Sequence, residues 1–180
     1  GHKWADLSEG SYGVSLMNDC KYGYSMKDRV MTQTLIKSGT EPNLTADQEE
    51  HSFTYSLYPH AGTWREAGTV QEALNLNVPA KAVFGAAEKD RMEFLSADKR
   101  NVVLETVKKA EDGDGMIVRL YEVENARTKV TLHCAESILS AEETNLLEQP
   151  ADGAIDVKEN EISLTIKPYE IRTIRIRTEK

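Results

Sequence analysis

Short runs of alternating apolar and polar residues, separated by turn formers, constrain the fold of this 180-residue chain more than any other feature. Such alternation places Ile162, Leu164 and Ile166 on one face of a strand, and Ile174 with Ile176 on one face of another. From about residue 83 the chain consists of runs of this kind, namely "NVVLETVKKAEDGDGMIVRLYEV", which reads as a hairpin, "KVTLHCA", "EISLTIKP" and "EIRTIRIRT". The pattern predicts an all-β fold built as an antiparallel β-sandwich.

The last of these strands carries an irregularity. Ile171 is out of phase with Ile174 and Ile176, which predicts a bulge or kink after Pro168. The polar positions in and before this strand predict an exposed basic row on the solvated face of a half-buried sheet, made of Lys167, Arg172, Arg175 and Arg177.

The first 80 residues hold fewer elements. "YGVSLMND" and "RVMTQTLIKS" alternate as strands do, and the turn-rich "NDCKYGYSMKD" between them predicts a loop that presents Lys21, Tyr22 and Tyr24 outward. About three strands and one helix are few for an independent domain, and they would leave sheet edges unpaired. We therefore expect a boundary near Pro79, with domains over residues 1–80 and 81–180, and a chain that is a piece of something longer.

One helix is predicted around residues 64–76. Thr63 followed by Glu66 forms a capping box, in which each side chain satisfies a backbone N–H at the start of a helix. The apolar positions that follow recur at helical spacing and would face a core: Trp64, Ala67, Val70 and Leu74. Pro79 is the expected stop.

Composition excludes several partners. The chain has 22 basic and 30 acidic residues, and a net charge of -8 argues against nucleic acid or an anionic membrane surface. No apolar run approaches the roughly 20 residues of a membrane span. The two cysteines, Cys20 and Cys134, form no CxxC motif, and this usage favours a reducing, cytoplasmic setting without disulfides.

The richest cluster of chemically active side chains is "HSFTYSLYPHAGTW", residues 51–64. His51 and His60 differ by an odd number of positions, so a straight strand would point them to opposite faces, too far apart for one zinc ion. We therefore interpret the stretch as a strand, a turn and the start of a helix. "EDGDG" lacks the later ligands of a calcium loop, since Met116 and Val123 stand at those positions.

Other candidate groups are equally weak. Asp6 with Glu9, and Glu49 with Glu50, are carboxylate pairs that favour solvated charges over a glycosidase acid and nucleophile. Cys20 beside Lys21 has no histidine nearby in the sequence to activate it, which favours an ordinary half-buried thiol. The sequence thus predicts no catalytic residue, no metal ligand and no cofactor in this chain.

Four stretches nevertheless resemble one family in order along the chain: "HKWADLSEGSYGVSLMNDCKYGYS", "HSFTYSLYPHAGTWREA", "NVVLETVKKAEDGDGMIVRLYE" and "KPYEIRTIRI". They are similar to the C-terminal end of α-mannosidases of glycoside hydrolase family 38, most of all the long cytosolic and bacterial type. The resemblance implies that residues 1–80 are the last strands of a mutarotase-like β-supersandwich plus a linking helix. It implies a smaller terminal β-sandwich over residues 81–180.

For function, the resemblance implies a much longer parent enzyme that removes terminal α-mannosyl residues with retention. Its zinc and its nucleophile belong to an N-terminal catalytic domain whose motifs are absent from this sequence. This chain would be a non-catalytic C-terminal part that supports the catalytic domain and assembly, with α-mannosides as partners through the parent. Substrate-site accessory residues implied by the resemblance are Asn18, Asp19, Lys21, Tyr22 and Lys37.

Two alternatives remain open from the sequence. The chain is also compatible with a carbohydrate-binding module that holds mannosides through exposed Trp4, Tyr22 or Trp64, although the helical spacing of Trp64 turns that ring toward a core. A homo-oligomer assembled through this region is the other hypothesis.

Overall fold

The computed structural model describes residues 1–86 and 88–179 and divides into two compact units, Gly1–Phe84 and Gly85–Lys180. We call them the N-terminal and the C-terminal unit and describe each by itself. No helix in the described part of the chain is long and apolar enough to cross a membrane.

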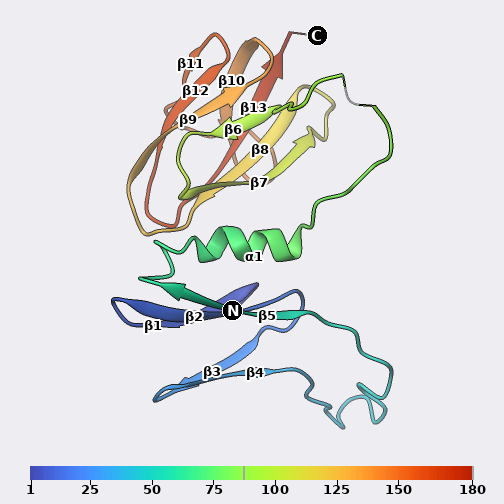
Figure 1. The fold of residues 1–180 in the computed structure, drawn as a ribbon. Coiled ribbons are helices and arrows are strands. Elements are labelled where there is room, and N and C mark those ends of the chain that lie inside the picture. Colours follow the sequence, from blue (N-terminus) through green and yellow to red (C-terminus); the bar gives the residue numbers. More distant parts are fainter. Residues whose placement is uncertain (87, 180) are drawn as a thin grey trace. The chain divides into compact units, whose positions relative to one another are not determined.

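The N-terminal unit consists of a three-stranded antiparallel sheet, a separate hairpin and one helix (Figure 1). The sheet has the order β1–β2–β5, with β2 in the centre. The helix α1 lies on one side of this sheet and the β3–β4 hairpin on the other (Figure 1). The elements are β1 (Trp4–Ser8), β2 (Tyr12–Asn18), β3 (Gly23–Lys27), β4 (Val30–Thr34), β5 (Tyr55–Ala61) and α1 (Thr69–Asn77).

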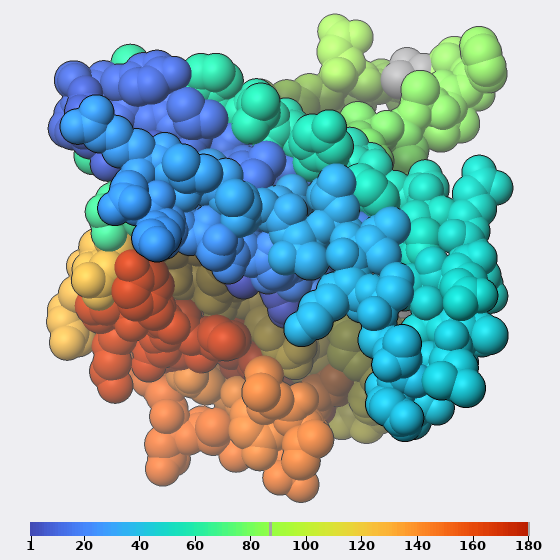
Figure 2. All heavy atoms as spheres, turned by 90° about the horizontal axis from the view of Figure 1, so that it is seen from below, coloured from blue at the N-terminus to red at the C-terminus, as the bar shows by residue number. Residues whose placement is uncertain are grey.

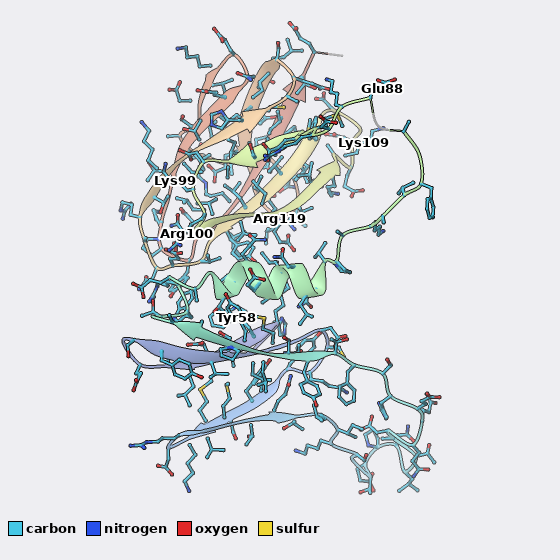
Figure 3. All side chains as sticks on the ribbon, in the orientation of Figure 1. Tyr58, Glu88, Lys99, Arg100, Lys109 and Arg119 are labelled. Carbon is cyan, nitrogen blue, oxygen red and sulfur yellow. The ribbon has the colours of Figure 1, made fainter. Side chains whose placement is uncertain are left out.

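The alternation of β5 decides which of its side chains meet the helix. Ser56, Tyr58 and His60 are more buried than their neighbours along the strand. Tyr58, labelled in Figure 3, donates a hydrogen bond from its hydroxyl to the carbonyl of Ala67, 3.1 Å away, just before α1. The strand predicted from "HSFTYSLYPHAGTW" is therefore confirmed, with one face directed at the helical segment.

The predicted start of the helix is wrong. The capping box forms, because the Thr63 N–H donates to Glu66 Oε2 at 2.8 Å and the Glu66 N–H donates to Thr63 Oγ1 at 3.4 Å. It caps only a turn, however, since Gly68 adopts a left-handed conformation with φ 69° and interrupts the helical path. The helix proper begins at Thr69 and buries Thr69 and Ala73.

The long loop predicted for "NDCKYGYSMKD" is also wrong. Residues 23–27 form β3, which pairs with β4 in register from Gly23 with Thr34 to Lys27 with Val30. Asp28, with φ 55°, occupies the tight turn between them. The connecting loop therefore shrinks to residues 19–22, and the hairpin lies at the surface shown in Figure 2.

The C-terminal unit is the predicted antiparallel sandwich. Its two four-stranded sheets have the orders β10–β13–β8–β7 and β11–β12–β9–β6. The core between the sheets contains Ile162, Leu164 and Ile166 from one sheet, and Ile174 and Ile176 from the other. The strands are β6 (Leu95–Ala97), β7 (Val102–Lys109), β8 (Met116–Glu122), β9 (Thr128–Cys134), β10 (Ile138–Thr144), β11 (Asp156–Lys158), β12 (Glu161–Ile166) and β13 (Ile171–Thr178).

Two members of the basic row predicted to be exposed are buried, whereas Lys167 is exposed and Arg177 is partly exposed. Arg172 and Arg175 are 9% and 7% exposed. Arg175 donates to Asp112 at 2.6 Å, and Arg177 donates to Asp114 at 2.9 Å. These hydrogen bonds lower the pKa of both aspartates, so the Gly-Asp-rich turn stays ionised against β13.

Of the bulge or kink predicted after Pro168, the chain forms a change of direction and no bulge. The β13–β8 register runs without a break from Ile171. A turn over residues 167–170, with Tyr169 at φ 55°, precedes the strand. Ile171 alternates regularly with Ile174 and Ile176 and lies on the outer face, where it is exposed. The pairing of β13 with its other neighbour, β10, does contain a register shift, which lies on β10 between Ile138 and Ser140.

Candidate functional site

The loop that follows β2 holds three of the five residues proposed from the sequence, and a fourth, Asn18, ends β2 and anchors the loop. Its side chain is buried, and its Oδ1 accepts a hydrogen bond from the Lys21 N–H at 2.6 Å. Its amide donates to the hydroxyl of Tyr24, while its carbonyl accepts from Asn77 Nδ2 at 3.0 Å. The Asn18 side chain is thus engaged within the chain and holds the loop closed. The predicted outward direction of Tyr24 is wrong, since its hydroxyl turns to Asn18.

Asp19 fixes the other side of the loop. Both of its carboxylate oxygens accept from the Thr54 N–H at 3.0 Å. The hydrogen bond from Thr54, together with one from Cys20, lowers the pKa of Asp19. The hydrogen bond between Cys20 and Asp19 raises the pKa of the Cys20 thiol. Cys20 is exposed rather than half-buried, and its raised pKa keeps the thiol protonated, which disfavours a nucleophile.

Lys21 and Tyr22 form the tip of the loop. The ammonium of Lys21 lies 4.7 Å from the centre of the Phe53 ring, and its carbonyl accepts from Gln33 Nε2 at 3.0 Å. Tyr22 is 53% exposed, and its ring centre lies 4.5 Å from that of His2. The tip therefore presents an aromatic surface on a backbone held by hydrogen bonds.

Lys37 lies outside this arrangement. It is exposed and follows β4 in a segment without regular structure. Within residues 1–86 and 88–179 the structure gives Lys37 no hydrogen bond or ion pair to the loop, so it does not bring this fifth residue into contact with the other four.

The two tryptophans face each other. The ring centres of Trp4 and Trp64 lie 5.1 Å apart, and the Arg65 guanidinium lies 4.3 Å from the Trp64 ring centre. Both indoles are partly buried. Of the three aromatic residues considered for sugar contact, Tyr22 is therefore the exposed one.

A buried polar network on the helix side of the sheet was not predicted. Asp6 Oδ2 accepts from Ser15 Oγ at 2.7 Å and from His60 Nε2 at 2.8 Å, and the Asp6 and His60 side chains are each 3% exposed. Ser15 Oγ also lies 2.8 Å from Thr69 Oγ1, which connects the network to the first residue of α1. A Cβ at Gly13 would lie 2.4 Å from the His60 ring, so the imidazole packs directly on the backbone of β2.

These contacts do not assemble a metal site. Among the residues that the structure describes, no group of three or more His, Cys, Asp or Glu side chains is placed to hold a metal ion. Among these described residues, His60 Nδ1 is buried without a hydrogen-bond partner. Asp6 already accepts hydrogen bonds from Ser15 and His60.

Two family models match the chain. "Glycosyl hydrolases family 38 C-terminal domain" matches residues 1–45, and "Glycosyl hydrolases family 38 C-terminal beta sandwich domain" matches residues 101–174. The chain belongs to glycoside hydrolase family 38, and both matches are to C-terminal domains of that family.

Relatives within glycoside hydrolase family 38 align along nearly the whole chain. Alpha-mannosidase G of Dictyostelium discoideum is 38% identical and covers 97% of this chain, and alpha-mannosidase 2C1 of Mus musculus is 36% identical and covers 96%. In both cases the chain spans only 17% of the relative's length. The predicted resemblance is confirmed at the level of the family.

A solved family 38 structure has the same fold. The α-mannosidase from Enterococcus faecalis V583 superposes with a TM-score of 0.76 at 22% identity, covering 98% of this chain and 21% of that one. This likeness confirms the all-β architecture with one short helix.

Proposed function

We propose that this chain is a non-catalytic C-terminal part of a retaining, zinc-dependent α-mannosidase, where it supports the catalytic domain and assembly. The observation that carries the proposal is the alignment with α-mannosidases over nearly the whole chain but only 17% of their length. Residues 1–80 would end a mutarotase-like β-domain, and residues 81–180 would be the terminal sandwich. Zinc would be held outside this chain, in the catalytic domain, where it would bind hydroxyls of the sugar.

Purified alone, the chain is expected to show no turnover of a chromogenic α-mannoside, with or without added zinc. Retaining hydrolysis needs two carboxyl groups about 5 Å apart, one of them free to attack the sugar. Here Asp6 and Asp19 are each engaged by donors within the chain. The full-length parent, assayed in parallel, is the positive control and should lose activity on chelation. Turnover by the purified chain clearly above a blank would contradict the proposal.

We further propose that the loop of Asp19, Lys21 and Tyr22, held by Asn18, closes one side of the sugar site in the parent, with Lys37 nearby. The exposed Tyr22 ring on a fixed backbone supports this role. A cytoplasmic location is also proposed, supported by the free thiols of Cys20 and Cys134. Homo-oligomerisation of the parent stays a prediction.

In the parent, Tyr22→Ala is expected to lower kcat/KM for an α-mannoside about fivefold, because one aromatic contact is worth about 1 kcal/mol. Tyr169→Ala is the matched control, since its ring is similarly exposed, at 57%, but lies in the other unit. The control should leave kcat/KM unchanged. Equal rates for the Tyr22 variant and the natural parent would remove Tyr22 from the substrate site.

A titration of the isolated chain with mannose tests the binding-module alternative.

A further inference from the structure

The C-terminal unit contains a pocket of about 510 Å³, which is within the size range of small-molecule sites. Two strands that lie side by side, β12 and β9, supply Ser163, Thr165 and Lys129 to its lining (Figure 1). The loop between β10 and β11 supplies Asp152, and β11 supplies Asp156. Polar side chains from separate segments thus converge on one hollow.

The strand pairing explains why these side chains meet. Because Leu164 is a core residue, its neighbours Ser163 and Thr165 point to the opposite face of β12. Asp156 lies opposite Ser163 on β11, and Lys129 lies opposite Thr165 on β9. Directly paired residues have Cβ atoms about 5 Å apart, so these four polar side chains form one cluster on the outer face of the sheet.

The loop that follows β10 is held in place beside this cluster. The Ala151 N–H donates to the carbonyl of Glu143 at 2.9 Å, and a Cβ at Gly153 would overlap Glu143 Oε2, so this close approach requires glycine. The Glu143 carboxylate is bound in turn by Arg172, whose Nη1 donates to the carbonyl of Thr165 at 2.9 Å. Hydrogen bonds therefore join the loop wall of the pocket to its strand wall.

Three charged side chains of the lining are not engaged within the chain. In the described residues, the side chains of Lys129, Asp152 and Asp156 make no hydrogen bond or ion pair. The remaining charged residues of the lining pair with each other, namely Glu143 with Arg172 and Glu170 with Lys167. The pocket thus offers one donor cation and two acceptor carboxylates to a ligand.

We propose that this pocket binds a neutral saccharide. One free ammonium beside two free carboxylates leaves a negative balance, which disfavours phosphate and other anions. A divalent cation is not favoured either, since among the described residues no group of three or more His, Cys, Asp or Glu is placed to hold a metal ion. A sugar hydroxyl both donates and accepts, so neighbouring hydroxyls of one ring can engage Lys129, Asp152 and Asp156 together. The inference goes beyond the proposed function, because it concerns binding by the terminal sandwich of this chain itself.

Nuclear magnetic resonance of the isolated chain tests the pocket, with α-mannobiose as the probe. The disaccharide should shift the amide signals of residues 152–156 and 163–165, with a dissociation constant in the millimolar range. Asp156→Ala should weaken binding about tenfold, because it removes a charged acceptor of sugar hydroxyls. Lys158→Ala is the matched control, since Lys158 is exposed on the same strand but outside the lining, and it should leave the dissociation constant unchanged.

Unchanged amide signals at these residues, or equal affinity of the Asp156→Ala variant and the natural chain, would overturn the proposal. Shifts confined to the loop of Tyr22, and lost in Tyr22→Ala, would overturn it in favour of that loop. Calcium chloride and sodium phosphate are each added alone, and shifts at the pocket with either salt but not with α-mannobiose would overturn it in favour of an ion. Lys129→Met repeats the measurement should Asp156→Ala fail to fold.

Discussion

Glu143→Ala is expected to lower the free energy of unfolding of the C-terminal unit by about 3 kcal/mol. Glu143 on β10 accepts hydrogen bonds from both Nε and Nη2 of Arg172 on β13, and the two side chains are only 13% and 10% exposed. Arg172 is held further by Nη1, which donates to the carbonyl of Thr165 at 2.9 Å. Removing the carboxylate would leave this guanidinium buried without its anion. Urea unfolding followed by far-UV circular dichroism measures the loss.

The double variant Glu143→Leu with Arg172→Met is the control. Replacing both members of a buried ion pair by apolar side chains of similar size is often close to neutral, so most of the loss should disappear. Both tryptophans, Trp4 and Trp64, lie in the N-terminal unit, so the fluorescence transition should stay in place while the dichroism transition shifts. If the single and double variants lose the same free energy of unfolding, the ion pair of Glu143 and Arg172 is not the cause of the loss.

The sandwich could be predicted from sequence because its signals are local. Alternation in "EISLTIKP" and "EIRTIRIRT" identifies which side chains share a face, and Leu164, Ile174 and Ile176 lie in the core as that alternation predicts. Alternation does not say whether the opposite face meets water. Arg175 is buried because it donates hydrogen bonds to Asp112 and to the carbonyl of Glu148, which lie in turns distant in the sequence. The sequence of the strand itself does not indicate these contacts.

The candidate loop was proposed from the family resemblance together with its residue types, but its hydrogen bonds and its boundary with β3 could not be predicted. Turn formers in "NDCKYGYSMKD" mask β3, whose pairing with β4 is visible only in the register. Asn18 was proposed as a substrate-site accessory, and nothing in the sequence indicated that its side chain is buried and bound to Lys21 N–H. The amphipathic signal of Trp64 was interpreted as helix because the left-handed conformation of Gly68 is not encoded in hydrophobic spacing.

The buried network of the N-terminal unit is the largest feature that local patterns missed, because Asp6 and His60 are 54 residues apart in the sequence. Asp6→Ala is expected to lower the free energy of unfolding of this unit by about 3 kcal/mol. The substitution removes the acceptor of both Ser15 Oγ and His60 Nε2 and leaves the imidazole buried with no partner on either nitrogen. Urea unfolding read by tryptophan fluorescence measures the effect, since both indoles lie in this unit.

Two further variants separate the network from a general effect of substitution near β1. Asp6→Asn keeps one acceptor oxygen and should lose only about 1 kcal/mol, whereas Glu9→Ala, at an exposed position in the adjacent turn, should leave the midpoint unchanged. Because Ser15 connects Asp6 to Thr69 at the start of α1, the Asp6→Ala variant should also lose amide protection in that helix before the sheet opens, as measured by hydrogen exchange. An Asp6→Ala midpoint equal to that of Glu9→Ala would mean that the network does not hold the helix on the sheet.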